Sequence, residues 1–334
     1  MRTAITRTHF KGFIHFAEGK SLIRSYKGKI FTSDDGGYNY KELIDLAGSI
    51  KEQITLSNAK LRRLFRFYIY HIVHLKNRLF VFGLGRIFIL SLQTKSVEKV
   101  LPLSGKRPLI ICSDRESVYY GEYVTNTNRK PVSIYKYTDA SESFEVFKEF
   151  KDIRHVHGVF HDPFSDNIFV TTGDDNSESF IGYFAGDELK KIAAGSQQDR
   201  VVPLLFSRDY VYYATDAPKE INYIYRVNRK TEKKERLQQI GGTVFYGALN
   251  TNGMIFSTVV DVNKAHRQDC VELWYSKDGS DWQIIHEFKK DIWPKNLFQH
   301  GHLMISDKQY NSKSFWFTPM ATEGDHYIHR IDFE

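Results

Sequence analysis

The sequence predicts an all-β fold, a β-propeller, because one strand pattern recurs along the chain. Four short apolar runs each end on an acidic residue, with spacings of 52, 42 and 45 residues between the acids. The acids are Glu122, Asp174, Asp216 and Asp261. A repeat of about 40 to 50 residues that contains strands is typical of propeller blades. Aromatic residues, which favour sheets, make up 15% of the chain, and only 8 of its 334 residues are proline.

The apolar runs fit blades of four antiparallel strands, named a to d along each repeat. Six runs fit strand c, at residues 29–33, 87–90, 134–137, 181–184, 224–227 and 271–276. The segment 314–333 supplies a further blade, so we expect seven blades, with six as the alternative. They would form a single domain over residues 1–334, closed by pairing between the two ends of the chain. Segment 49–65 fits the repeat least and suits a short helix or a long excursion.

Net charge and missing motifs narrow the classes of function. The formal charge of +7 suits an anionic partner such as an acidic glycan or a nucleotide sugar, although a solvated basic surface is the alternative. The aromatic residues sit in strands rather than in a basic stripe, which argues against nucleic-acid binding. We find no phosphate-binding loop, no Gly-x-Ser-x-Gly and no His-Glu-x-x-His. No secretory pattern and no bilayer-length apolar stretch is present, so we expect a cytoplasmic protein without a transmembrane segment.

Two segments after strand c carry a recognisable turn motif. Residues 33–40 read SDDGGYNY and residues 276–282 read SKDGSDW, and residues 138–144 hold a degenerate third copy. These segments resemble the Asp-box (BNR) repeat, Ser-x-Asp-x-Gly-x-x-Trp, of the sialidase-like superfamily. The resemblance implies a propeller fold, and it implies that Asp35 and Asp278 stabilise turns rather than perform chemistry. Propellers of this family include glycan hydrolases, sugar-binding proteins and scaffold receptors, so the fold alone does not fix the function.

Three arginines recur at the starts of strands a, in register with the acids. Arg107, Arg154 and Arg200 follow one another after 47 and 46 residues. A guanidinium can grip a carboxylate or phosphate through two hydrogen bonds, so three of them suit an anionic sugar. Sialidase-like enzymes use a similar arginine cluster, but their Arg-Ile/Leu-Pro motif is missing here and their Tyr and Glu nucleophile pair cannot be placed. The alternative is that each arginine pairs with an acid of a neighbouring blade and links the sheets.

The acids and histidines suggest catalytic roles. We expect Asp174 and Asp216 to perform acid/base chemistry with help from His157, because glycoside hydrolysis needs two carboxyl groups. Glu122, Asp261 and Tyr246 are expected substrate contacts. The alternative for the acids is a structural role in turns.

No cofactor is required by this interpretation, but a divalent metal ion is an alternative. Three carboxylates can hold Ca²⁺ or Mg²⁺, and the pairs His155/His157 and His300/His302 can each present two imidazoles on one face of a strand.

The sequence therefore predicts a carbohydrate-active enzyme that acts on an acidic glycan as a glycosidase-like hydrolase or a lyase. Two alternatives remain open. One is a glycosyltransferase in polysaccharide assembly that uses a nucleotide sugar. The other is a non-catalytic propeller scaffold that binds a glycan or a protein.

Overall fold

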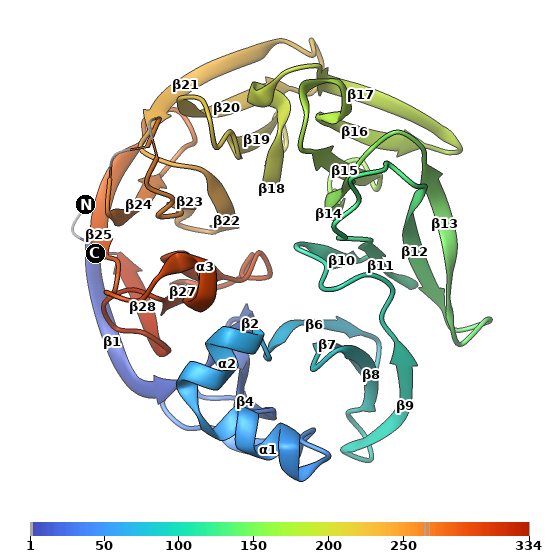
Figure 1. The fold of residues 1–334 in the computed structure, drawn as a ribbon, viewed down its shortest axis with the longest axis vertical. Helices are drawn as coiled ribbons and strands as arrows, with labels where there is room; N and C mark the ends of the chain where they lie inside the picture. The colour runs from blue at the N-terminus through green and yellow to red at the C-terminus, as the bar shows by residue number, and fades with distance from the viewer. Residues whose placement is uncertain (1–2, 264, 267, 334) are drawn as a thin grey trace. The chain divides into compact units, whose positions relative to one another are not determined.

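Seven four-stranded antiparallel sheets make up the computed structural model, which describes residues 3–263, 265–266 and 268–333. In six of them the four strands lie in chain order (Figure 1). The chain is thus a seven-bladed β-propeller, which confirms the predicted fold class and selects seven blades over six. The aromatic and β-branched runs of the sequence form the strands, since such side chains pack well on pleated surfaces.

Contacts divide the described chain into two compact units, the first comprising residues up to Ile72 and from Tyr246 onward, and the second Val73–Phe245. Strands β6 and β22 each span a boundary between the units. The sheets assigned to the first unit contain β1 (Thr3–Lys11), β2 (Phe13–Glu18), β3 (Ser21–Tyr26), β4 (Lys29–Ser33), β5 (Lys41–Asp45), β22 (Val244–Asn250), β23 (Gly253–Thr258), β24 (Cys270–Ser276), β25 (Gln283–Lys289), β26 (His302–Ile305), β27 (Phe315–Met320) and β28 (Tyr327–Phe333).

The second unit holds four consecutive sheets, each built from four successive strands. Their strands are β6 (Ile69–Leu75), β7 (Arg78–Gly83), β8 (Arg86–Ser91), β9 (Ser96–Pro102), β10 (Ile111–Ser113), β11 (Ser117–Gly121), β12 (Val132–Thr138), β13 (Phe144–Phe150), β14 (His155–His161), β15 (Ile168–Gly173), β16 (Phe180–Ala185), β17 (Glu188–Ala194), β18 (Val201–Phe206), β19 (Tyr210–Thr215), β20 (Asn222–Asn228) and β21 (Lys234–Ile240). Every strand c predicted from the sequence is present.

The first and last strands of the described chain share one sheet. β1 joins β28, with Thr3 opposite Phe333, so one sheet has the order β1-β28-β27-β26. Figure 1 shows β1 and β28 in the same part of the molecule. The predicted pairing of the chain ends is confirmed.

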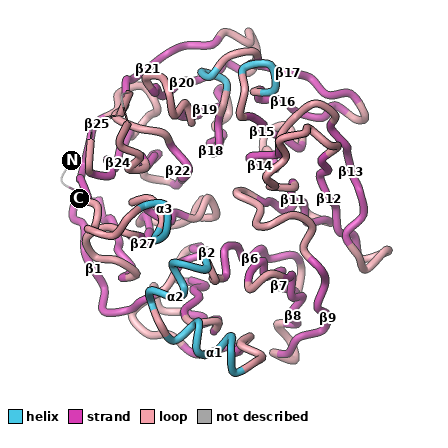
Figure 2. Tube along the Cα trace, viewed as in Figure 1, coloured by secondary structure: helices cyan, strands magenta, loops and turns pink. Residues whose placement is uncertain are grey.

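Helices are confined to short segments, which Figure 2 shows in cyan. Segment 49–65 forms α1 (Ile50–Ser57) and α2 (Ala59–Phe65), and α3 (Lys295–Phe298) is a single turn. Ser49 and Glu52 form a reciprocal capping box at the start of α1, and the side chain of Asn58 caps α2. These caps explain why a helix forms where the strand repeat fails. Among the described residues, no helix has the length and apolarity needed to cross a bilayer.

The two motif turns have the hydrogen bonds that such sequences favour. The carboxylate of Asp35 accepts bonds from the backbone N–H of Tyr38 and Asn39, each at 3.0 Å, in the turn between β4 and β5. The carboxylate of Asp278 accepts one from the backbone of Ser280 at 2.8 Å, after β24. Both acids therefore stabilise turns, as side-chain caps do in tight loops.

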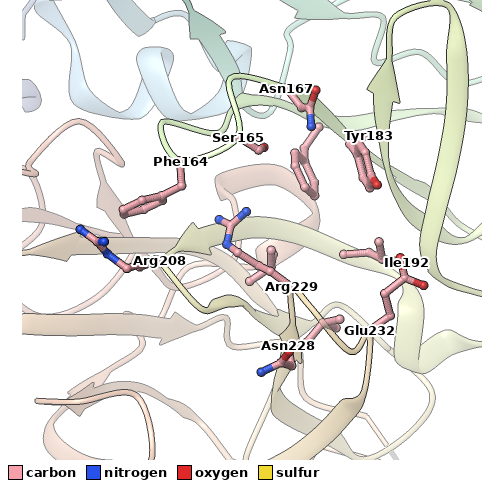
Figure 3. Close-up of a pocket in the computed structure, with 12 residues that line it drawn as sticks. Phe164, Ser165, Asn167, Tyr183, Ile192, Arg208, Asn228, Arg229 and Glu232 are labelled. Carbon is pink, nitrogen blue, oxygen red and sulfur yellow. The ribbon is translucent and has the colours of Figure 1, made fainter.

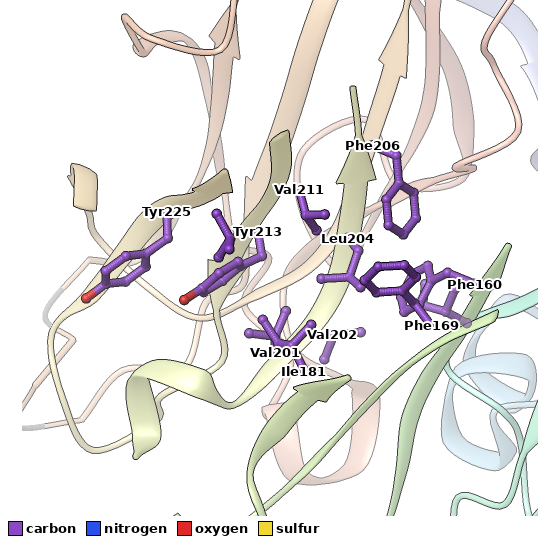
Figure 4. Close-up of a cluster of buried hydrophobic side chains, with 12 residues drawn as sticks. Phe160, Phe169, Ile181, Val201, Val202, Leu204, Phe206, Val211, Tyr213 and Tyr225 are labelled. Atoms are coloured by element: carbon purple, nitrogen blue, oxygen red, sulfur yellow. The ribbon is translucent and has the colours of Figure 1, made fainter. Parts of the chain in front are cut away.

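Neighbouring sheets of the second unit bury their side chains against one another. Figure 4 shows one such core, in which Phe160 and Phe169 of one sheet pack with Val201, Leu204 and Phe206 of the next. Because both faces of these sheets are covered here, β15 and β18 are buried along their whole length rather than alternately. This packing fixes how the ends of adjacent sheets face each other, and the candidate site lies at such ends.

Candidate functional site

Charged residues from two adjacent sheets of the second unit converge where the strands begin or end. Arg154 lies just before β14 and Asp174 just after β15, while Arg200 and Asp216 hold the equivalent places around β18 and β19. These four residues, with His155 and His157 of β14, are called the charged cluster below. Two of the three predicted arginines and two of the four predicted acids therefore meet, as the repeat spacing indicated.

Asp174 is the centre of the charged cluster. Its Oδ2 lies 2.7 Å from Nη1 of Arg154, and its Oδ1 lies 2.9 Å from Nη2 of Arg200. The Nε2 atoms of His155 and His157 each lie 3.5 Å from the same Oδ1. Burial by itself raises the pKa of Asp174, but the two imidazoles and the charge of Arg200 outweigh it and hold the pKa well below its ordinary value. Asp174 is thus a fixed negative charge.

Arg200 links the two sheets. It contacts Asp174 of the preceding sheet, and its Nε lies 3.2 Å from Oδ2 of Asp216. Asp216 is only 4% exposed, and this burial raises its pKa although Arg200 opposes the change. The alternative stated from the sequence, an arginine that joins neighbouring blades through their acids, describes Arg200.

Tyr123 adjoins the charged cluster on the side of the preceding sheet. Its ring centroid lies 4.2 Å from that of His155, and its side chain is partly exposed. Burial raises the pKa of Tyr123, the carboxylates of Asp216 and Asp174 add to the increase, and the charges of Arg107 and Arg200 oppose it. The charge of Arg107 therefore affects the pKa of Tyr123, so the third predicted arginine lies within electrostatic range of the same site.

Glu178 supports the charged cluster and is not among the site residues predicted from the sequence. It is 3% exposed and lies after Asp174 in a 3₁₀ turn (Asn176–Glu178). Its carboxylate accepts hydrogen bonds from the backbone N–H of Asp174, Asp175 and Arg154, and from the guanidinium of Arg129. Glu178 thereby holds the backbone of both Asp174 and Arg154 in place. The available signal was Asp175 followed three residues later by Glu178, which is a capping-box spacing.

A β-bulge sets the direction of His157. The pairing register between β14 and β15 shifts between Val156 and Gly158, so His157 faces no partner residue on β15. Bulges redirect side chains and often occur next to functional sites. Here the Nε2 atoms of His157 and His155 come within 3.1 Å of each other. With Asp174 they form the one group of three potential metal ligands found among the residues that the structure describes.

The remaining predicted site residues have other partners. The carboxylate of Glu122 accepts hydrogen bonds from the backbone of Ser133 at 2.8 Å and from the hydroxyl of Ser104. Asp261 belongs to the first unit, where it is ion-paired with Lys295. Tyr246 stacks on His302 in the same unit, with ring centroids 5.6 Å apart. Their proposed contacts with a substrate stay predictions.

A cavity of ≈ 200 Å³ lies at the opposite ends of the same strands, by the turns that join β14 to β15 and β18 to β19 (Figure 3). Phe164, Asn167 and Arg208 are among its lining residues. None of the predicted site residues lines this cavity. The cavity and the charged cluster are therefore two separate candidate ligand sites on one pair of sheets.

Comparison with known proteins bears on the fold alone. No family model matches the chain, and no curated protein matches it in sequence. The chain is similar in structure to the extracellular domain of the putative one component system BT4673 from B. thetaiotaomicron, with a TM-score of 0.60 and 12% identity. All of this chain is covered in that comparison, but only 40% of the other.

A second similar structure is the WD40 β-propeller domain of Doa1. Its TM-score is 0.63 at 11% identity, with 99% of this chain and 96% of the other covered. At such low identity the likeness shows a shared architecture and carries no information about ligands or chemistry. The comparisons thus support the assignment of the chain as a β-propeller.

Proposed function

We propose that this protein binds an acidic carbohydrate at the charged cluster, with the sugar carboxylate held by Arg154. The observation that carries the proposal is the state of the Arg154 guanidinium. Its Nη1 is bonded to Asp174, but its buried Nε has no hydrogen-bond partner among the described residues. The Arg154 side chain is also 32% exposed, so a ligand can reach the part of it that faces solvent, although Nε itself is buried. A buried donor without a partner is rare in folded proteins, and an acceptor bound beside the guanidinium would account for it.

Three arginines act on this site, Arg107, Arg154 and Arg200. The acids beside them already have cationic partners: Asp174 and Asp216 pair with these arginines, and Asp175 and Glu178 pair with Arg129. The partly exposed ring of Tyr123 offers an apolar face with a polar tip, and such rings commonly contact sugars and other amphipathic ligands. Asp-box-like turns at Asp35 and Asp278 agree with a relationship to glycan-binding propellers, and this relationship forms part of the proposal.

Binding is better supported than glycoside hydrolysis. Hydrolysis needs a protonated carboxyl group within reach of the glycosidic oxygen and a second carboxyl group beside it. Asp174 is held ionised by two guanidinium groups, and Asp216 is buried and paired with Arg200. The hydrolase, lyase and glycosyltransferase roles predicted from the sequence have no comparable support from the contacts of these residues.

Calorimetric titration with an oligogalacturonate tests the proposal, with the neutral oligosaccharide of equal length as the ligand control. We expect saturable binding of the acidic sugar that weakens with salt and falls at least about 10-fold in Arg154→Gln, because one charge-assisted pair contributes roughly 1.5–3 kcal/mol. Arg226→Gln is the matched protein control, since Arg226 also pairs with an acid of its own sheet, Glu235 at 2.8 Å. Equal binding of both sugars, or equal binding by both variants, would contradict the proposal.

A second candidate function, protein docking, is favoured by an apolar surface of the first unit. Helix α2 contacts α3 and its flanking segment: Lys60 lies over the ring of Trp293, and Arg63 bonds to the carbonyl of Phe298. Large apolar side chains are exposed around this contact. They are Ile50, Ile54, Leu64, Phe65, Ile292, Trp293 and Leu297. Since α1 contacts α2 and α2 contacts α3, these side chains lie on neighbouring elements, and exposed apolar surface of this kind typically marks an interaction site.

The charge of the helices indicates the partner. Lys51 and Lys60 are exposed, whereas the side chain of Glu52 is engaged in the cap of α1. We infer a protein partner that presents an apolar surface with acidic residues around it. Trp293 is a built-in reporter, because Trp274, Trp282 and Trp316 are buried. An amphipathic helical peptide of Leu and Glu should shift the fluorescence of the native protein but not of Trp293→Phe, and Ile292→Ser should weaken its binding. No shift with this peptide, or an equal shift with a Leu and Lys peptide, would contradict docking here.

A further inference from the structure

The hydrogen bonds of His155 and His157 fix which ring nitrogen carries a proton. Nδ1 of His155 lies 2.9 Å from the carbonyl oxygen of Val124, and Nδ1 of His157 lies 3.0 Å from that of Val201. A carbonyl oxygen only accepts hydrogen bonds, so Nδ1 must be the donor in both rings. In the neutral form of each imidazole, Nε2 is then left as a lone pair. Metal-bound histidines are commonly oriented in this way, through a backbone carbonyl on the other nitrogen.

These two lone pairs point at the same place. The Nε2 atoms of His155 and His157 are 3.1 Å apart, and Oδ1 of Asp174 lies 3.5 Å from each. Both histidines are at least nine-tenths buried. Nη2 of Arg200 lies 2.9 Å from Oδ1 and offsets its charge, but two imidazole lone pairs 3.1 Å apart still repel one another unless a cation lies between them. That cation is either a proton shared by the two rings or a metal ion.

We propose that His155, His157 and Asp174 bind a divalent transition-metal ion of the Zn²⁺ class, a site that goes beyond the proposed carbohydrate function. Zinc lies about 2.0–2.1 Å from imidazole nitrogen and about 2.0–2.2 Å from carboxylate oxygen. In a tetrahedral site, ligand atoms at those bond lengths are about 3.3–3.5 Å from one another. The two separations of 3.5 Å fall in this range, and the 3.1 Å between the imidazole nitrogens is about 0.2 Å below it.

The donor set selects among metal ions. Two of the three ligands are neutral imidazoles, which suit zinc, cobalt, nickel and copper, whereas Ca²⁺ and Mg²⁺ require mainly oxygen ligands. Arg154 and Arg200 already offset the charge of Asp174. This further disfavours Ca²⁺ and Mg²⁺, which depend on negatively charged oxygen ligands. Three protein ligands leave a fourth position for water or another oxygen ligand, as in the zinc sites of hydrolytic enzymes.

The surroundings hold the three ligands in place. The His157 ring packs directly on Gly173, where an added Cβ would lie 2.9 Å from its Cε1. Nη1 of Arg154 holds the second carboxylate oxygen of Asp174, so Oδ1 keeps facing the imidazoles. Glu178 fixes the backbone N–H of Asp174. Such supporting contacts typically account for a 10- to 100-fold difference in metal affinity.

Cobalt titration of the untagged, chelator-treated protein tests the site directly. We expect one equivalent of Co²⁺ to bind and give the visible absorption of a tetrahedral complex, and Zn²⁺ to displace it. His155→Gln and His157→Gln should each weaken binding at least about 10-fold. His161→Gln is the matched control, because His161 ends the same strand and pairs with the exposed Asp166 instead. Its metal affinity should equal that of the native protein.

Thermal unfolding and circular dichroism of the apo variants show whether each one folds. If His157→Gln is misfolded, His155→Gln decides, and Gly173→Ala adds a test that keeps all three ligands while moving the His157 ring. Absence of a tetrahedral cobalt spectrum in the native protein would overturn the proposal and leave a shared proton between the rings. Equal affinity in His161→Gln and the two site variants would overturn it as well. No carbohydrate is present in this experiment, so its outcome is independent of the proposed function.

Discussion

Substitution of Glu178 tests how the charged cluster is held together. The carboxylate accepts five hydrogen bonds, three from the backbone N–H of Asp174, Asp175 and Arg154 and two from Arg129, at 2.7–3.0 Å. Glu178→Gln preserves the shape of the side chain but replaces one acceptor oxygen with an NH₂ donor. Whichever way the amide turns, at least two part-buried N–H groups, one of them on the backbone, then face a donor instead of an acceptor.

The expected loss of stability follows from these contacts. A buried polar group left without a partner costs about 1–3 kcal/mol, so two such groups give a loss of about 2–6 kcal/mol. Arg129 also loses the full charge of its partner, although its solvent access limits that contribution. We therefore expect Glu178→Gln to lower the free energy of unfolding by about 3–4 kcal/mol, a large part of the 5–15 kcal/mol typical of folded domains.

Urea unfolding followed by circular dichroism measures this change from the shift in the midpoint at constant slope. Glu235→Gln is the matched control, because Glu235 also pairs with an arginine, Arg226, but is half exposed. We expect the control to change stability by less than about 1 kcal/mol. A loss below about 1 kcal/mol in Glu178→Gln, or equal losses in both variants, would refute the role given to Glu178.

Two further predictions concern other buried groups. Burial lowers the pKa of His15 from 6.5 to about 3, with the charges of His71 and Lys308 adding to the effect. The unfolded chain therefore takes up a proton below pH 6.5 that the folded chain does not, so the free energy of unfolding should fall below pH 6.5 by up to about 1.4 kcal/mol per pH unit. Urea midpoints between pH 7 and pH 5 measure this fall. If His15→Gln showed the same pH dependence as the native protein, the assignment would be contradicted. Asp162 is fully buried and binds both Nη atoms of Arg229. Asp162→Asn should therefore lower the free energy of unfolding by about 3 kcal/mol, which thermal unfolding measures. A melting temperature equal to that of the native protein would contradict this.

The strands were predictable because their pattern is local. The runs 29–33 and 271–276 agree with β4 and β24, since an apolar run between polar turns has few alternatives to a buried strand. Segment 49–65 was recognisable as the exception, and its capping residues Ser49 and Asn58 explain its helices. Assignment to the Asp-box family cannot follow from the fold, because the same turns can arise wherever Ser and Asp precede a glycine.

The site was predictable to the extent that it follows the repeat. Arg154, Asp174 and Arg200 meet because equivalent positions of adjacent blades lie side by side. The bulge at His157 was not predictable, because simple alternation already places His155 and His157 on one face and gives no sign of a changed register. The role of Glu178 depends on backbone donors from three residues, which no spacing rule specifies.

A crystal structure of the protein soaked with an oligogalacturonate would test the central claim, that the charged cluster is the ligand site. We predict a sugar carboxylate within hydrogen-bonding distance of Arg154 and a sugar ring against Tyr123. Density for the sugar in the cavity lined by Phe164 and Arg208, at the other ends of the strands, would contradict the account.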